Sequence, residues 1–347
     1  MLKNAFWGIA LAVFILLTAG TGCPGSTPPP TPSQGLIDLG SLGGGNASAA
    51  SINNHDQIVG SSRNASGASH AYLWDGTHGM QDLGIMQEGS SGGAYAINDA
   101  GQVVGVEISM LDVTMYGFLW DSSEGMRNLD MVDGQQAVAA EDINNSGQVV
   151  GWLYEDYAYT DGFLWDPTDG MQTLASVCGQ QGLACAINDS GQICAMSLDY
   201  MSAFFWDSDS EIYTIINDSE DDWFYVPASL NNSGVVVGYY YQGLDVRGFI
   251  WNEEDGFQEL ATLGGTSRAF DINNAGQVVG SSVPEDSDVA HAFYWDADTG
   301  VLDLNDLIEP DSGWVLEKAS SINDSGHIVG TGTYNGEPNH AFLFTGL

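Results

Sequence analysis

The chain has 347 residues, of which 46 are acidic and only 6 are Lys or Arg, giving a formal charge of −40 at neutral pH. A field this negative excludes nucleic acids and anionic membrane surfaces as partners, because both are bound through clusters of basic residues. The charge is typical of a solvated acidic shell, with specific cation sites as the alternative.

Residues 1–22 have the pattern of an export signal. Lys3 supplies a positive start, and the apolar run over residues 5–17 is shorter than a comfortable membrane span. The run leads into Leu-Thr-Ala-Gly-Thr-Gly-Cys, which resembles a bacterial lipoprotein signal, although Gly20 stands where such signals usually have Leu. In those signals the cysteine, here Cys23, becomes the lipidated first residue. We therefore expect an exported protein of the cell envelope whose only membrane contact is a lipid anchor at Cys23, with simple secretion as the alternative.

Residues 23–34 form a segment rich in Pro, Ser and Thr, which cannot pack into a core and predicts an extended spacer. In the remainder, residues 35–347, a nine-residue phrase recurs seven times at intervals of 42 to 50 residues. Its copies are INNHDQIVG at 52–60, INDAGQVVG at 97–105, INNSGQVVG at 143–151, INDSGQICA at 187–195, LNNSGVVVG at 230–238, INNAGQVVG at 272–280 and INDSGHIVG at 322–330.

A period near 45 residues indicates one supersecondary unit repeated in tandem, which buries its apolar faces only against its neighbours. The seven predicted repeats are 35–78, 79–124, 125–169, 170–210, 211–255, 256–299 and 300–347.

Each repeat contains four short apolar segments, which we name a to d in chain order. They are rich in β-branched and aromatic residues and bounded by Gly, Asn and Asp, as in LIDLG at 36–40 and AYLWD at 71–75. These features predict strands, and no repeat has a sustained helical period. Short turns rich in Asn, Asp and Gly join b to c and d to the next a. Segments b, c, d and the following a therefore predict a four-stranded antiparallel meander.

Segment b carries small side chains, as at residues 47–51 and 184–186, and these suit the strands nearest the axis of a radial array. The predicted fold class is all-β, a seven-bladed β-propeller of four-stranded blades with b innermost. Residues 36–40 should join the last blade beside residues 341–344 and close the ring. An open β-solenoid and two smaller propellers are the alternatives, and the even spacing disfavours both.

The phrase IN[DN]xGQ[VI]VG, followed by [AG]-F-L-W-D, resembles the HAF repeat family of bacterial extracellular proteins. The triplet that gives the family its name stands at residues 291–293 and 340–342 and, with Tyr for Phe, at 70–72; the other four repeats lack the His. The resemblance covers residues 35–347. It implies an exported repeat protein of propeller type with no established activity.

The turns from b to c and from d to a are nearly constant in length, whereas the links from a to b and from c to d vary. Strand alternation places the variable links on one face, which we name the loop face, and the constant turns on the other, the turn face. Variable loops are where specificity resides. The candidate ligand-binding residues on the loop face are Trp152, Tyr154, Tyr157, Tyr159, Tyr200, Trp223, Tyr225, Tyr239, Tyr240, Tyr241, Asp156, Asp199 and Asp245.

Flat aromatic rings interleaved with carboxylates suit a protein partner or a glycan, and packing of these rings on the blade ends is the alternative. The leading hypothesis is a surface-tethered, non-enzymatic binding or scaffold protein. A carbohydrate-active hydrolase or lyase using loop carboxylates is the second reading, although no spacing singles out a pair. A purely structural envelope protein is the third.

No cofactor is expected. Calcium is the ion that best suits the Gly-ended acidic loops at 166–170 and 296–300, but these coincide with turns where Asp and Gly are expected anyway. Three cysteines follow Cys23. An exported protein can keep a disulfide, and Cys185 is the candidate to pair with Cys178 or with Cys194, leaving one free thiol.

Overall fold

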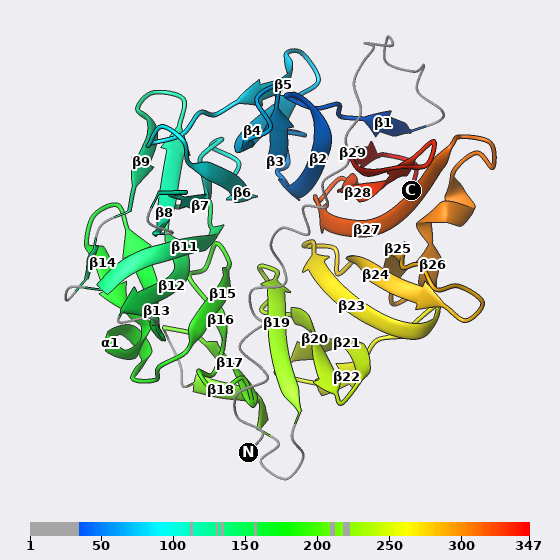
Figure 1. The fold of residues 1–347 in the computed structure, drawn as a ribbon. Coiled ribbons are helices and arrows are strands. Elements are labelled where there is room, and N and C mark those ends of the chain that lie inside the picture. The colour runs from blue at the N-terminus through cyan, green and yellow to red at the C-terminus, as the bar shows by residue number, and fades with distance from the viewer. Residues whose placement is uncertain are drawn as a thin grey trace, which may run out of the picture. The chain divides into compact units, whose positions relative to one another are not determined.

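The structure, a computed structural model, describes residues 35–111, 114–129, 131–132, 135–155, 158–208, 212–217 and 223–347. These residues form seven antiparallel sheets in a ring, a seven-bladed β-propeller (Figure 1). The predicted all-β fold and blade number are confirmed. The predicted signal peptide, the spacer and Cys23 lie outside the described residues. Within the described ranges, no helix combines the length and apolar character needed to cross a membrane.

Each blade combines strands b, c and d of one repeat with strand a of the next. The innermost strands are β2 (Gly43–Ile52), β6 (Ser91–Ile97), β11 (Gln135–Ile143), β15 (Leu183–Ile187), β19 (Phe224–Leu230), β23 (Gly264–Ile272) and β27 (Trp314–Ile322). The second strands are β3 (Ile58–Asn64), β7 (Val103–Ile108), β12 (Val149–Glu155), β16 (Ile193–Met196), β20 (Val236–Gln242), β24 (Val278–Pro284) and β28 (Ile328–Tyr334).

The two outer strands of each blade complete the sheets. The third strands are β4 (Ser69–Asp75), β8 (Met115–Asp121), β13 (Ala158–Asp166), β17 (Ser202–Trp206), β21 (Asp245–Asn252), β25 (His291–Asp296) and β29 (Glu337–Phe344). The outermost are β5 (Gly79–Asp82), β9 (Gly125–Asn128), β14 (Gly170–Thr173), β18 (Ile212–Asn217), β22 (Gly256–Glu259), β26 (Gly300–Asp303) and β1 (Leu36–Asp38). A short strand, β10 (Met131–Val132), joins β11, and the helices α1 (Leu174–Cys178) and η1 (Leu304–Leu307) follow β14 and β26.

The first strand of the propeller closes the ring by joining the last blade, as the order of segments predicts. β1 pairs antiparallel with β29, with Leu36 opposite Phe344 and Asp38 opposite Phe342 (Figure 1). Leu36 and Phe344 are buried in the same apolar cluster. The two ends of the propeller are therefore joined by hydrogen bonds and by a shared core.

The hydrophobic core is divided among the interfaces between neighbouring blades. Each of seven clusters of buried side chains draws its members from two adjacent blades. The apolar face of a blade is covered only by its neighbour, so one repeat has no core of its own. Every cluster contains the aromatic second residue of segment d, which is almost inaccessible to solvent: Tyr72, Phe118, Phe163, Phe204, Phe249, Phe293 and Phe342.

A closed belt of asparagine side chains links the blades on the turn face. The first Asn of each repeated phrase donates from Nδ2 to the backbone oxygen of the matching Asn in the next blade, at 2.9 to 3.2 Å. The bond from Asn323 to Asn53 returns to the first blade. The belt consists of Asn53, Asn98, Asn144, Asn188, Asn231, Asn273 and Asn323, all buried.

Asn144 shows how the rest of the phrase supports the belt. Its Oδ1 accepts the backbone N–H groups of Ser146 at 3.1 Å and Gln148 at 2.9 Å, and its Nδ2 also donates to Gln148 Oε1 at 2.8 Å. Every polar atom of this buried amide is therefore paired. Gly147 between them has φ of 80°, where a larger side chain would be strained. The phrase thus encodes a hairpin that is also a joint between blades.

A second ring lies beside the belt, formed by the residue after each belt asparagine. The backbone N–H of each of these residues donates to Oδ1 of the matching residue in the next blade, at 2.8 to 3.0 Å. The second oxygen of Asp189 accepts from the amides of Asn145 and Asn232, at 3.1 and 3.0 Å. We name these residues the turn ring: Asn54, Asp99, Asn145, Asp189, Asn232, Asn274 and Asp324.

The recurring histidines also have structural partners. In three blades the His of strand d lies against an Asp of strand a in the same sheet, with one oxygen near Nδ1. The pairs are His70 with Asp82 at 2.9 Å, His291 with Asp303 at 2.6 Å and His340 with Asp38 at 3.3 Å. The motif that gives the HAF resemblance its name therefore joins the two outer strands of a blade.

We predict that Asn144→Ala lowers the free energy of unfolding by about 3 kcal/mol, because it removes the bond to the next blade and leaves the partly buried N–H groups of Ser146 and Gln148 without their partner. Denaturant unfolding followed by circular dichroism measures the change. Asn145→Ala, in the exposed turn ring, is the matched control and should cost about 1 kcal/mol or less. Equal losses of unfolding free energy in the two variants would show that the belt adds no more stability than an ordinary turn does.

Candidate functional site

The innermost strands of neighbouring blades contact one another around the whole ring and enclose an axial channel. Each of these strands carries a bulge two residues before its last residue, where one residue has no partner on the second strand. A bulge redirects the extra side chain. Bulge residues of different blades interact, as Glu141 does with Tyr95 and Cys185, so they line the channel. The bulge residues are Ala50, Tyr95, Glu141, Cys185, Ala228, Phe270 and Ser320.

Two adjacent carboxyl groups of the third blade, Glu141 and Asp142, stand in this wall. Burial raises the pKa of Glu141 to about 8, and the neighbouring charge of Asp142 adds to the effect. Burial also raises the pKa of Asp142 to about 7, although the backbone N–H groups of Ile187 and Ile143 act against it. Both side chains are packed within the protein, and each keeps a partial exposure to solvent in the channel. Burial therefore favours the protonated form of Glu141 near neutral pH, and a protonated carboxyl can donate a hydrogen bond.

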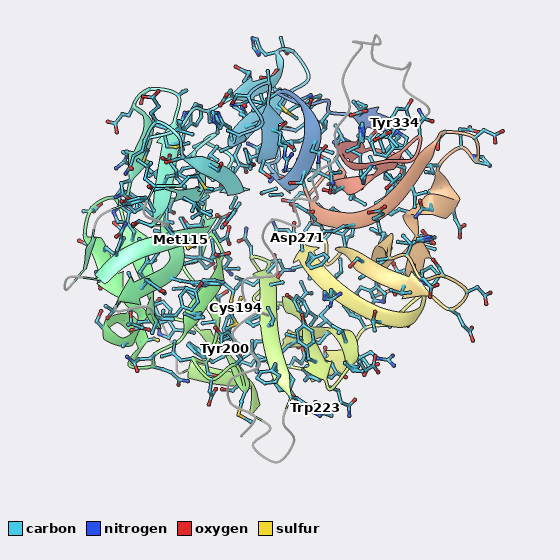
Figure 2. All side chains as sticks on the ribbon, viewed as in Figure 1. Met115, Cys194, Tyr200, Trp223, Asp271 and Tyr334 are labelled. Carbon is cyan, nitrogen blue, oxygen red and sulfur yellow. The ribbon has the colours of Figure 1, made fainter. Side chains whose placement is uncertain are left out.

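The turn-face end of the channel is a cavity of about 190 Å³, walled by the belt, the turn ring and a layer of polar side chains. Asp271 belongs to that layer and lies close to the axis (Figure 2). Its carboxylate accepts the hydroxyls of Ser229 and Ser321, both at 2.7 Å, and so bridges three blades. Burial raises the pKa of Asp271. Because both carboxylate oxygens of Asp271 already have hydrogen-bond partners within the protein, we infer that this end of the channel has a structural role.

Four of the predicted aromatic residues gather at the loop-face end of the channel. The ring of Tyr159 stands edge-on to Trp152 and Tyr154, with centroids 5.4 and 5.5 Å apart. Tyr200, from the fourth blade, lies close enough that it adds to the effect of burial in raising the pKa of Tyr159. All four side chains are half-buried. We name them the mouth cluster: Trp152, Tyr154, Tyr159 and Tyr200.

The predicted aromatic residues of the fifth blade divide into two groups, because successive side chains of β20 point to opposite faces. Tyr240 points into the core, where it stacks with Trp223 and Tyr225 at centroid distances of 5.3 and 5.7 Å. Tyr239 and Tyr241 point toward the sixth blade. Tyr225, Tyr239 and Tyr240 are buried, so these predicted ligand contacts are packing residues.

The predicted loop carboxylates are used within their own loops. Asp199 accepts the hydroxyl of Ser197 at 2.6 Å, which lowers its pKa, and Asp245 pairs with Arg247 at 2.9 Å. Asp156 and Tyr157 lie outside the described residues. Among the residues that the structure describes, no three His, Cys, Asp or Glu side chains are grouped to hold a metal ion. Asp166 and Asp296, from the loops considered for calcium, accept the N–H groups of their own turns.

The predicted disulfide does not form: Cys178, Cys185 and Cys194 are all free thiols. Cys178 ends α1, with its Sγ at 3.2 Å from the backbone oxygen of Leu174. Cys194 is buried in the core between two blades. The bulge directs Cys185 toward the channel, and its Sγ lies 3.3 Å from the backbone oxygen of Leu183. Cys178 packs against the core between the third and fourth blades, whereas Cys185 and Cys194 lie against the core between the fourth and fifth.

The channel residues Tyr95, Glu141 and Phe270 were not predicted from the sequence. A signal was present at the bulge position. Three repeats have Ala or Ser two residues before the end of segment b, whereas the others have Tyr, Glu, Cys and Phe there. Large or ionisable side chains at a position otherwise kept small mark a place where the repeats differ for a reason other than packing.

We predict that the channel acids make stability fall with rising pH. The folded protein keeps protons on Glu141 and Asp142 at pH values where the unfolded chain has lost them. Their contribution is complete below about pH 4 and is lost as the pH rises toward about 8. The loss is on the order of 3 kcal/mol. Thermal unfolding between pH 5 and 8.5 measures it, and Glu141→Gln should flatten the slope. The exposed Glu124→Gln is the control, and an equal slope in both variants would contradict the assignment.

Comparison with known protein families finds a similarity over part of this chain. A family model described as a protein of unknown function (DUF3466) matches residues 46–183. No curated protein matches the chain.

Solved structures share the fold at very low identity. Oligogalacturonate lyase in complex with manganese is 11% identical, with a TM-score of 0.61 over 90% of this chain and 93% of that one. Virginiamycin B lyase from Staphylococcus aureus is 5% identical, with a TM-score of 0.56 over 89% and 98%. YCF48 bound to D1 peptide is 10% identical, with a TM-score of 0.53 over 91% and 97%. These likenesses show a propeller fold that occurs in lyases and in a peptide-binding protein alike.

Proposed function

We propose that this protein is a non-enzymatic binding protein that recognises a glycan or a protein partner at the loop-face end of its channel. The observation that carries the proposal is the mouth cluster, whose four half-exposed aromatic side chains meet from two adjacent blades beside the channel. Amphipathic rings of this kind contribute much of the binding energy at recognition surfaces.

The division of the repeat supports this location. The recurring residues of the phrase form the belt and the hairpins, and the recurring His and Asp residues join strands within a blade. The residues that differ between repeats are those at the bulge and on the loop face. A scaffold built from the constant residues thus presents variable residues at one end, as expected of a binding module.

Glu141 favours a second candidate, a carbohydrate-active hydrolase or lyase. A carboxylic acid that stays protonated at neutral pH suits a general acid, and Asp142 stands next to it. Release of shorter oligosaccharides by the purified protein, lost in Glu141→Gln, would favour catalysis over simple recognition.

We predict that the double variant Tyr154→Ala/Tyr159→Ala weakens ligand binding about tenfold or more, because each aromatic anchor at such a surface contributes on the order of 1–2 kcal/mol. Binding is measured on glycan and peptide arrays and then by titration. Tyr334→Ala is the matched control, since Tyr334 lies on another blade away from the axis (Figure 2). Binding by the double variant at parental strength would reject the mouth cluster as the recognition surface.

We also propose that the protein belongs to the HAF repeat type and is exported and lipid-anchored, on the pattern of residues 1–23 and of the repeats. Cys23→Ala removes the thiol that is expected to carry the lipid. We therefore expect loss of metabolic fatty-acid labelling and release of the protein from the membrane fraction, because stable anchoring depends on attached acyl chains. Cys178→Ala is the control. Labelling that persists in Cys23→Ala would place the lipid elsewhere or reject it.

A further inference from the structure

The basic residues of the propeller divide into two groups by their partners. On the outer strands, Arg127 lies 3.5 Å from Glu124, and Arg247 lies 2.9 Å from Asp245. Three others lie on the two inner strands of consecutive blades, and in the described part of the chain their side chains make neither an ion pair nor a hydrogen bond. They are Arg63, Arg268 and Lys318. In a chain with 46 acidic residues, cations without carboxylate partners are unexpected.

Two of these cations share one aromatic surface. The guanidinium of Arg268 on β23 lies 5.6 Å from the ring centroid of Tyr239 and 5.7 Å from that of Tyr241. The Nζ of Lys318 on β27 lies 4.5 Å from the ring centroid of Phe270, the bulge residue of β23. The rings of Phe270 and Tyr239 are 6.1 Å apart. The two cations, from the sixth and seventh blades, therefore stand over a continuous run of rings from the fifth and sixth blades.

No anion within the described residues compensates this pair. Burial lowers the pKa of Lys318, and the charge that acts on it further is Arg268, which is also positive. Its neighbour in sequence, Glu317, instead accepts the hydroxyl of Thr333 at 2.6 Å. Contact with ring faces offsets part of the cost of holding a desolvated cation, but two adjacent like charges still lack a counter-charge. Such a local violation is expected where a ligand completes the site.

We propose that Arg268 and Lys318 bind the carboxylate of a uronic-acid residue at the end of a glycan. This inference deepens the recognition proposed above and rests on it. A guanidinium presents paired N–H donors to the two oxygens of a carboxylate, and an ammonium group adds a point charge. The partly exposed rings of Tyr241 and Phe270 offer apolar surface to the C–H groups of a sugar ring.

The surroundings also limit the kind of acidic ligand. A formal charge of −40 repels a polyanion, so a neutral glycan carrying one acidic terminal sugar fits better than a polyuronate. A peptide terminus also carries a carboxylate, but its main chain needs hydrogen-bonding partners, and the partly exposed neighbours of the cations, Tyr241 and Phe270, are aromatic. The neutral part of the glycan would extend to the mouth cluster.

The test uses cellobiouronic acid, which has one uronic-acid end, and cellobiose, which differs only in carrying a hydroxymethyl group in place of the carboxylate. Isothermal titration with the full propeller at low ionic strength should give at least tenfold tighter binding of the acid. Arg268→Met and Lys318→Met should each remove most of this preference, whereas Lys318→Arg should keep it. Arg127→Met removes a positive charge outside the channel and is the control. Thermal unfolding identifies variants that have not folded.

Equal binding of acid and cellobiose, or a preference retained in both Met variants, would overturn the proposal. Acetate or triglycine bound as tightly as cellobiouronic acid would also overturn it, by showing a site for bare anions or for peptide ends. Glycan binding that is lost in Tyr154→Ala/Tyr159→Ala but does not distinguish acid from neutral sugar would keep the recognition surface and reject only the carboxylate site. Binding unaffected by the tyrosine variants would instead reject the proposed function.

Discussion

One buried amide per repeat determines how the blades are joined. Apolar contacts between blades are non-directional and would tolerate sliding of one sheet over the next. The belt removes that freedom, because each Nδ2 must meet one backbone oxygen of the next blade at hydrogen-bond distance. Only a closed ring gives every donor an acceptor, and Asn323 completes it by reaching Asn53. The same amide organises its own hairpin, so local folding and assembly of the ring depend on one side chain.

The turn ring shows how the number of blades limits such a design. Each of its Asp residues accepts from the amides of both Asn neighbours, as Asp189 does from Asn145 and Asn232. With seven positions, strict alternation of acid and amide is impossible, and one pair of like residues must be adjacent. That pair is Asn232 and Asn274. The turn ring tolerates this pair because each backbone N–H still donates to the Oδ1 of the next residue of the ring, between Asn232 and Asn274 as elsewhere.

Most of the fold could be predicted from the sequence because the repeats are comparable with one another. Strand segments, hairpin turns, seven blades and closure by residues 36–40 all follow from period, composition and order. The belt could not be predicted, since a recurring Asn before Gly fits an ordinary hairpin equally well, and only the ring brings the next carbonyl within reach. Burial was misjudged at Tyr239 and Tyr240, because both belong to a strand of consecutive apolar residues with two covered faces.

The structure brings together only part of the aromatic set that the sequence predicts for the loop face. Trp152, Tyr154, Tyr159 and Tyr200 come together as a loop-face surface, although on the sequence alone they were not separated from the packing residues of the fifth blade. The channel residues were not predicted because a bulge changes which side chains face the axis. The strict alternation of side chains between the two faces of a strand does not apply there.

Closure by β1 has a mechanical consequence. Tension applied to the chain ahead of residue 35 enters the propeller at a strand of 3 residues that holds to β29 through 3 residue pairs at the outer edge. The belt lies at the opposite, inner edge of the sheets, so the load does not act on it directly. A pulled molecule would therefore release this outermost strand first, as a short extension that can be reversed, while the other blades keep their joints.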